Sequence, residues 1–169
     1  NYKKIYINKF KNLNKQFIFA LPSYNVRSTE LNAVIGINQL KFLDKNIKKR
    51  NQNHKVFLDN INSNKFFTDF DLNGSSNYAF NLVLKKPDHH FAKRLMKGMD
   101  KFGIEYRRGS AGGGNQLRQP YLINLFPKNY FKKFPNTEHI HFFGFYLGNY
   151  PSLKQQDIIN LCNKINSIN

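Results

Sequence analysis

The chain of 169 residues is 40% hydrophobic, with 17 Phe and 9 Tyr, which is enough for one domain with a packed core. This composition excludes a disordered polycation, and no apolar run is long enough to span a bilayer. The net charge of +17 raises the alternative of a basic nucleic-acid-binding module. However, the positive residues are mostly lysines scattered along the whole chain. We therefore do not interpret the net charge as evidence for a nucleic-acid partner.

The only cysteine, Cys162, lies on an apolar helix stripe, so we expect an inert buried thiol. No apolar segment typical of a signal peptide follows Asn1. Both features fit a reducing compartment, and we expect a cytoplasmic protein without a membrane segment.

Along the chain, residues 2–19 alternate apolar residues with Lys and Asn, which predicts loop and extended chain. Ser28 or Thr29 is typical of a helix N-cap, and Glu30 follows where the helix dipole favours an acid. The apolar residues of this helix cover more than one face, which predicts burial on several sides. They are Leu31, Val34, Ile35, Ile37, Leu40 and Leu43. A second helix begins near Asp44, and His54 on its apolar stripe is expected in the core.

The motif "NYAFNLVL" over residues 77–84 predicts a strand after the turn signal "NGSSN". Asp88 then begins a helix that ends at Gly103, a residue typical of a left-handed C-terminal cap. The motif "IEYRR" over residues 104–108 predicts a short second strand.

A short helix is expected around residues 137–143, and it ends at Gly144. The motif "FYLG" predicts a last strand, and "SLKQ" from Ser152 to Gln155 is typical of a capping box that begins a final helix. These elements predict an α+β fold with a largely antiparallel sheet and helices on one side.

The segment "RRGSAGGGNQLRQP" over residues 107–120 holds four glycines in six residues. Such a run lets backbone N–H groups approach an anion closely, although a plain flexible loop is the alternative. Four of only six arginines lie here or near residue 27, and an arginine fork suits phosphate or carboxylate. The sequence lacks Cys or carboxylate residues at ligand spacing beside its histidines, which predicts no metal site. The residues alone give no complete active site.

Three segments of the sequence resemble stretches of a known protein family. The segment "LPSYNVRSTELNAVIGINQLKFLD" (residues 21–44) resembles the stretch after the cofactor lysine in the DegT/StrS family of pyridoxal-phosphate-dependent sugar aminotransferases. The segments "GIEYRRGSAGGGNQLRQPYL" and "HFFGFYLGNYPSL" are similar to later stretches of that family, the former to its subgroup of deoxysugar 3-dehydratases. One departure is Arg107-Arg108, where the family has Arg-Pro.

The resemblance implies the small C-terminal domain of a fold-type-I transferase. Residues 1–27 would be the tail of the large domain and a turn that reaches the cofactor, and residues 28–169 the small domain. The Schiff-base lysine would lie upstream, so the resemblance implies no catalytic residue in this chain and no activity of this fragment alone.

The resemblance further implies a role for the Tyr-Asn-x-Arg turn, in which Tyr24, Asn25 and Arg27 bind pyridoxal 5'-phosphate (PLP) across a homodimer formed through residues 24–43. The residues themselves leave open that Asn25 only forms an Asx turn. The substrate would be a nucleotide-linked keto-sugar, with an amino donor such as glutamate, in lipopolysaccharide or polysaccharide biosynthesis. The residues implied to bind it are Arg107, Gly114, Asn115 and Arg118.

Overall fold

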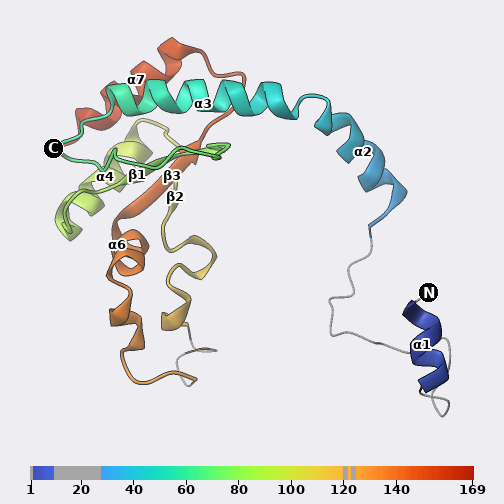
Figure 1. The fold of residues 1–169 in the computed structure, drawn as a ribbon. Helices are drawn as coiled ribbons and strands as arrows, with labels where there is room; N and C mark the ends of the chain where they lie inside the picture. Colours follow the sequence, from blue (N-terminus) through green and yellow to red (C-terminus); the bar gives the residue numbers. More distant parts are fainter. Residues whose placement is uncertain (1, 10–27, 120–121, 123–124) are drawn as a thin grey trace. The chain divides into compact units, whose positions relative to one another are not determined.

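The computed structural model describes residues 2–9, 28–119, 122 and 125–169 (Figure 1). Its contacts divide the chain into two compact units, residues 1–40 and 41–169. The boundary expected between residues 27 and 28 stays a prediction. Among the described residues, no helix combines the length and the apolar character needed to cross a bilayer.

The first helix, α1, spans Tyr2–Lys9. The expectation of loop and extended chain is therefore wrong for residues 2–9, and residues 10–19 lie outside the described part of the chain. This stretch contains neither Gly nor Pro, and Lys9 in its last turn complements the helix dipole. The alternation of polar and apolar residues was thus a weaker guide than the absence of helix breakers.

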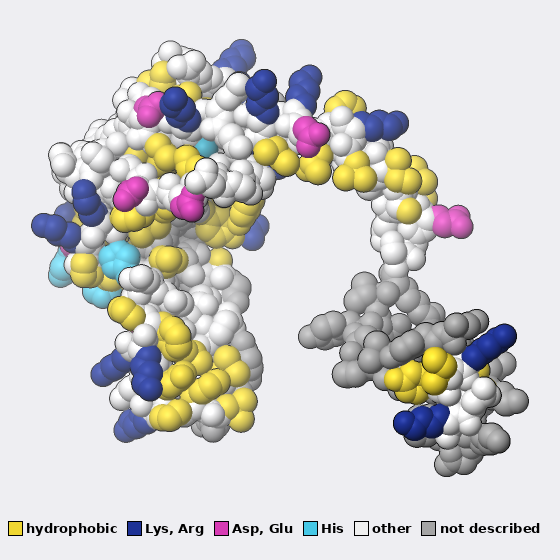
Figure 2. Space-filling view, viewed as in Figure 1, with side chains coloured by type: hydrophobic (Ala, Val, Ile, Leu, Met, Phe, Trp, Pro, Cys, Tyr) yellow, Lys and Arg dark blue, Asp and Glu magenta, His cyan; other side chains and the backbone are white. Residues whose placement is uncertain are grey.

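The second helix, α2, spans Glu30–Leu40. The hydroxyl oxygen of Thr29 accepts a hydrogen bond from the N–H of Asn32 at 3.4 Å, which confirms one of the two expected N-caps. The expected burial is not found within this chain, because α2 has no buried residue and its large apolar side chains are 61–75% exposed. Burial of α2 against another domain or subunit stays a prediction. Figure 2 shows hydrophobic side chains along its surface.

In the second unit, α3 (Leu43–Asn60) and α7 (Gln155–Asn166) lie side by side over a three-stranded sheet (Figure 1). The strands are β1 (Ala79–Val83), β2 (Arg107–Arg108) and β3 (Gly144–Gly148), in the antiparallel order β1-β3-β2. This arrangement confirms the α+β fold with an antiparallel sheet. Of the predicted strand over residues 104–108, only the last two residues pair with β3.

One face of the sheet packs in the core, and the other carries the exposed residues Asn81 and Arg107. Phe80 and Leu82 of β1 pack in the core that also contains Phe145 and Leu147 of β3. The alternate residues point the other way, because successive side chains of a strand lie on opposite faces. On that outer face, Tyr146 stands between Asn81 and Arg107 in the strand register.

Two helices connect the strands. Helix α4 spans His89–Lys101, and the Asp88 carboxylate accepts a hydrogen bond from the N–H of Phe91 at 2.8 Å. Gly103 has φ +65°, which confirms the left-handed residue expected after this helix. Helix α6 spans Pro135–Phe143 and leads directly into β3.

The expected capping box at Ser152 is wrong. Helix α7 begins at Gln155, after Lys154, and the Asp157 carboxylate accepts a hydrogen bond from the N–H of Lys154 at 3.4 Å. The Asp carboxylate at the third helical position therefore caps the helix instead of a serine hydroxyl. Cys162 on this helix is fully buried, and burial raises the pKa of its thiol to about 12, which confirms the inert thiol.

His54 confirms the expectation of a core histidine. It is fully buried, and its ring lies 6.1–6.4 Å from the rings of Phe57, Phe70 and Phe80. Neither ring nitrogen has a partner at hydrogen-bonding geometry among the described residues. Burial lowers the pKa of His54, and a contact with the Ala79 backbone offsets this shift only in part.

Candidate functional site

The glycine loop packs tightly against α6 and the start of β3. The N–H of Gly109 donates to the carbonyl oxygen of Gly144 at 2.7 Å, and a Cβ at Gly109 would lie 1.9 Å from the carbonyl oxygen of Ile140. A Cβ at Gly114, which has φ +61°, would lie 2.1 Å from Nδ1 of His141. These glycines are therefore needed for close contact within the chain.

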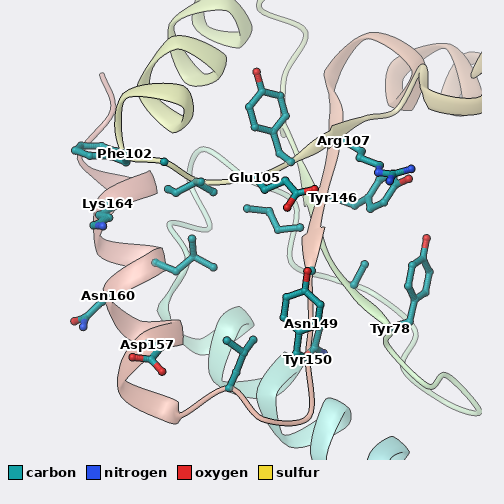
Figure 3. A pocket seen from close by; sticks show the side chains of 18 of the residues that line it. Tyr78, Phe102, Glu105, Arg107, Tyr146, Asn149, Tyr150, Asp157, Asn160 and Lys164 are labelled. Carbon is teal, nitrogen blue, oxygen red and sulfur yellow. The ribbon is translucent and has the colours of Figure 1, made fainter.

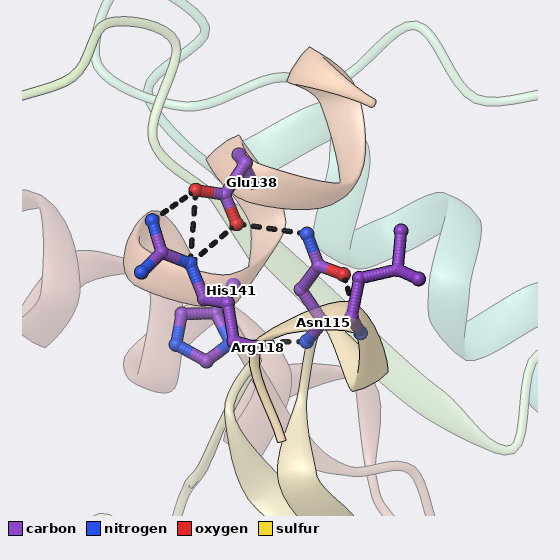
Figure 4. Close-up of polar contacts among 5 residues, drawn as sticks. Asn115, Arg118, Glu138 and His141 are labelled. Atoms are coloured by element: carbon purple, nitrogen blue, oxygen red, sulfur yellow. Dashed lines mark hydrogen bonds and ion pairs between the residues drawn. The ribbon is translucent and has the colours of Figure 1, made fainter. Parts of the chain in front are cut away.

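Four polar side chains hold the same loop to α6 (Figure 4). Asn115 is 2% exposed, its N–H donates to Nδ1 of His141 at 3.0 Å, and its Nδ2 donates to Oε1 of Glu138 at 2.8 Å. Nε of Arg118 donates to both Glu138 oxygens at 2.8 and 3.0 Å, and Nη2 of Arg118 donates to Oε2. We call these four residues the α6 clip.

The hydrogen bonds and the burial of the α6 clip shift the pKa values of Glu138 and His141. The hydrogen bonds from Arg118, and then from Asn115, hold the pKa of Glu138 below its usual range against the opposing effect of burial. Burial lowers the pKa of His141, which keeps its Nδ1 available as an acceptor. The guanidinium carbon of Arg118 also lies 4.0 Å from the ring centre of Phe131. Asn115 and Arg118 thus have partners inside the chain, and their contact with substrate stays a prediction.

A separate hollow of about 790 Å³ is lined by residues 102–107, by the end of β3 and by α7 (Figure 3). This volume is within the usual range for small-molecule sites. Of the residues predicted to bind substrate, Arg107 lines it, whereas Gly114, Asn115 and Arg118 belong to the neighbouring loop. The structure therefore groups three of the four predicted residues in the loop and places the fourth in the hollow.

Aromatic rings form much of the wall of the hollow. The rings of Tyr78 and Tyr146 meet edge to face with centroids 6.4 Å apart. Tyr150 covers Gly148 so closely that a Cβ there would lie 2.7 Å from the tyrosine ring. Glu105 and Arg107 also line the hollow (Figure 3). Aromatic faces together with a carboxylate and an arginine are the groups that hold a polyhydroxylated ring.

The hollow is lined by charged residues of both signs. Its cations are Arg50, Arg107 and Lys164, and its anions are Glu105 and Asp157. Of these five residues, only Arg107 is predicted from the sequence. Tyr146 could have been found, because it alternates with two buried residues of β3. Arg50 could not, because only the tertiary fold brings α3 to this hollow.

Buried amides fix the position of Arg50 on α3. Nδ2 of Asn149 donates to the carbonyl oxygen of Arg50 at 2.9 Å and to that of Asn77 at 2.7 Å. Asn53 donates to Oδ1 of Asn149 at 3.1 Å and to the carbonyl oxygen of Tyr150 at 3.0 Å. Asn53 and Asn149 are at most 2% exposed. This network joins α3 to the ends of β1 and β3.

The residues expected at the cofactor, Tyr24, Asn25 and Arg27, lie outside the described residues. The described structure begins again at Ser28, immediately before α2. Their roles therefore stay predictions.

The fold defines the class of protein. It matches the Escherichia coli GDP-4-keto-6-deoxy-D-mannose-3-dehydratase with bound hydrated PLP, with a TM-score of 0.73 and 29% identity over 89% of this chain and 39% of that one. It also matches the putative sugar aminotransferase Spr1654 from Streptococcus pneumoniae in its PMP form, with a TM-score of 0.71. That second match has 12% identity over 88% of this chain and 37% of the other, so it shows the fold alone.

Residues 3–166 match the DegT/DnrJ/EryC1/StrS aminotransferase family, and the chain belongs to this family. It is 31% identical over 137 residues to the GDP-4-keto-6-deoxy-D-mannose 3-dehydratase of Escherichia coli O55:H7. It is 24% identical over 147 residues to the lipopolysaccharide biosynthesis protein RfbH of Salmonella typhimurium. These matches cover 80% and 85% of this chain but 35% and 33% of the relatives, so the chain spans about a third of their length.

Proposed function

We propose that this chain is the C-terminal, substrate-contacting part of a PLP-dependent enzyme that acts on a nucleotide-linked keto-sugar. The observation that carries the proposal is the outer sheet face. There Arg107 and Tyr146 stand together in a hollow of about 790 Å³. The family membership supplies the chemistry, and the hollow supplies a place of suitable size.

Within this family, we propose removal of the sugar 3-hydroxyl, with transamination as the alternative. The first is favoured because the relatives at about 30% identity are 3-dehydratases. The sugar aminotransferase Spr1654 is only 12% identical, so it supports the fold and not the reaction. Glutamate is the proposed amino donor in either case, and the proposed setting is cytoplasmic lipopolysaccharide or polysaccharide biosynthesis.

Arg107 is the proposed sugar-binding residue, because its planar fork holds two adjacent oxygen atoms at fixed geometry. Glu105 beside it accepts hydrogen bonds from hydroxyl groups. Gly114, Asn115 and Arg118 are proposed to complete the substrate region through the loop backbone, which the α6 clip holds in place. Asn115 and Arg118 then act as positioning residues through Glu138.

The proposed cofactor is PLP, bound through its phosphate by Asn25, Arg27 and Tyr24. An amide donor, a guanidinium and a phenol hydroxyl are suitable partners for a phosphate dianion. When bound, PLP supplies the electron-withdrawing ring that this chemistry requires, and the protein contributes binding and orientation. We propose that the cofactor lysine lies outside residues 1–169, so that this chain alone is inactive.

A homodimer through residues 24–43 is the proposed assembly. The apolar side chains of α2 are 61–75% exposed, and an apolar surface of this kind marks an interaction site. Because the PLP-binding turn directly precedes α2, burying α2 against a second copy would bring the turn to the partner's cofactor.

The test uses the chain together with its upstream coding sequence, incubated with GDP-4-keto-6-deoxymannose, PLP and glutamate. Loss of the 3-hydroxyl, detected by mass spectrometry and NMR, supports the dehydratase, whereas an amine at the former keto carbon supports transamination. Arg107→Lys should raise KM about tenfold, the loss of roughly 1.4 kcal/mol of binding. The matched control is Arg108→Lys, because Arg108 does not line the hollow. The proposal is wrong if neither product forms, or if the two substitutions have equal effects on KM.

A further inference from the structure

The chain has 25 asparagines, and one of them, Asn73, is followed by a glycine. Asn73 and Gly74 form the tip of the loop between α3 and β1, where the N–H of Ser75 donates to the carbonyl oxygen of Leu72 at 3.2 Å. Gly74 has φ +69°, a value that glycine adopts readily at the third residue of such a turn. Both residues of the pair are exposed to solvent.

The fold leaves the reactive groups of this pair unbonded. Among the described residues, neither the side-chain amide of Asn73 nor the N–H of Gly74 has a hydrogen-bond partner. The backbone N–H of Asn73 does have one, because it donates to Oδ1 of Asp71 at 3.0 Å. The amide carbon of Asn73 is therefore free to turn toward the next peptide nitrogen, which carries no neighbouring Cβ to hinder the approach.

We propose that Asn73 is a site of spontaneous deamidation, at which the chain acquires aspartate and isoaspartate with time. The nitrogen of Gly74 attacks Cγ of Asn73, the Cγ–Nδ2 bond breaks, and ammonia leaves with the former Gly74 amide proton. Water then opens the cyclic imide. Cleavage between the Gly74 nitrogen and Cγ gives aspartate, and cleavage between that nitrogen and the backbone carbonyl carbon gives isoaspartate. Water is the only co-reactant, and the inference does not depend on the proposed function.

The best comparisons are Asn62 and Asn166, each of which precedes a serine. Oδ1 of Asn166 accepts a hydrogen bond from the N–H of Asn62 at 2.9 Å, and its Nδ2 donates to the carbonyl oxygen of Asn60 at 2.9 Å. Oδ1 of Asn62 accepts from the N–H of Asn64 at 2.9 Å. An amide held in this way must break its hydrogen bonds before it can turn toward the next nitrogen, so both residues should react more slowly than Asn73.

The loop also confines the effect of the change to the turn. After the turn, Nδ2 of Asn77 donates to Oδ1 of Asn51 at 2.9 Å, and the carbonyl oxygen of Asn77 accepts from Nδ2 of Asn149 at 2.7 Å. Before the turn, the ring of Phe70 lies 6.4 Å from the buried ring of His54. Because these contacts bracket the turn, the extra backbone carbon of isoaspartate should alter the turn without unfolding the second unit.

The experiment incubates the 169-residue chain at mildly alkaline pH and follows each asparagine by peptide mapping, with aspartyl and isoaspartyl peptides separated. We expect acid to form at Asn73 at least about tenfold faster than at Asn62 or Asn166. The same mapping in guanidinium chloride tests the part played by the fold. Unfolding should change the rate at Asn73 by less than about tenfold, whereas the rate at Asn166 should rise by more than that.

Two glycine substitutions separate the local chemistry from backbone strain. Gly74→Ala should slow the reaction at Asn73 about tenfold or more, because the new Cβ hinders the attacking nitrogen. The matched control is Gly103→Ala. Gly103 has φ +65°, and a Cβ at either glycine would meet no atom of the described residues within 4 Å. The control therefore carries similar strain and should leave the rate at Asn73 unchanged.

A further variant covers the case in which Gly74→Ala disturbs the fold. Asn73→Gln keeps a side-chain amide, and it should remove the fast-forming acidic species that isoelectric focusing detects in the ageing chain. Persistence of that species would reject Asn73 as the site.

Other outcomes also overturn the inference. It is wrong if acid forms at Asn73 no faster than at Asn62 and Asn166, or if the fold slows the reaction more than about tenfold relative to guanidinium chloride. Equal slowing by Gly103→Ala and Gly74→Ala would reject the role of the Gly74 nitrogen. Aspartate without isoaspartate would indicate direct hydrolysis of the amide and exclude the cyclic imide.

Discussion

Replacing Glu138 by alanine should destabilise the second unit by about 2 kcal/mol. The substitution removes the acceptor for two donors, the Arg118 guanidinium and the buried Nδ2 of Asn115. Hydrogen bonds to charged groups contribute about 1.5–3 kcal/mol, and an unsatisfied buried donor costs a similar amount. Arg118 and Glu138 are 33% and 19% exposed, so water replaces part of the loss. Glu138→Gln keeps an oxygen for Asn115, and about 1 kcal/mol is expected.

Urea unfolding followed by tyrosine fluorescence measures this effect, since the chain has no Trp. With a slope of about 2 kcal/mol per molar urea, the midpoint of Glu138→Ala should fall by about 1 M. The effect also has a defined pH window. The pKa of Glu138 is lowered in the fold, so its contribution is present above the unfolded pKa of about 4.3. It is lost as pH falls through the folded pKa.

The control is Glu105→Ala, which removes an exposed carboxylate that lines the hollow. If both substitutions shift the midpoint equally, the α6 clip contributes nothing beyond a surface charge. A second check is hydrogen exchange at the N–H of Asn115, which should speed up only in Glu138→Ala. Unchanged exchange there would mean that the glycine contacts alone hold the loop.

Four further predictions concern other parts of the chain. As pH falls, the unfolded state takes up the His54 proton before the folded state does, because burial lowers the pKa of His54 in the fold. Stability measured by urea should therefore fall as pH drops below about 6.5 and level off below the folded pKa. His54→Phe should make that fall smaller, and the remainder comes from His141, whose pKa burial also lowers. Borohydride reduction of the chain with PLP, followed by peptide mass mapping, should give no stoichiometric pyridoxyl-lysine. In the longer enzyme, Asn25→Ala should weaken cofactor retention roughly ten- to a hundredfold by equilibrium dialysis, and activity should return when this variant forms heterodimers with one that lacks the cofactor lysine. Duplex DNA should bind no tighter than about 10⁻⁴ to 10⁻⁶ M at physiological salt in a fluorescence titration; a sequence-selective nanomolar complex would restore the nucleic-acid alternative.

The elements predicted correctly are those whose signals are local. Asp88 and Gly103 bracket α4 because one side chain and one φ angle settle each end. Gly144 follows the last residue of α6 as expected, although its φ of −91° is extended and not left-handed. Local rules failed at Ser152, because α7 begins only at Gln155, where the Asp157 carboxylate accepts a hydrogen bond from the N–H of Lys154. They also failed over residues 2–9, whose pattern suits strand and helix equally.

The candidate site was harder to predict because its contacts join distant parts of the chain. Arg118 and Glu138 are 20 residues apart, and no periodicity links them. The partner of a scarce arginine could therefore not be found from spacing, although the arginine itself was singled out. Arg50 was overlooked among lysines of the same helix. What distinguishes it is a buried, unpaired nitrogen, which only the folded chain shows.

The exposed apolar surface of α2 has a consequence for the life of this polypeptide in a cell. A helix of 11 residues is shorter than the roughly 12–15 residues that even good sequences need to stay helical alone in water. Where nothing covers α2, we expect it to fray and to present Leu31, Val34 and Ile35 to chaperones and proteases. The steady-state level of this chain would then depend on the supply of whatever covers α2. An excess of unassembled copies would be removed by degradation.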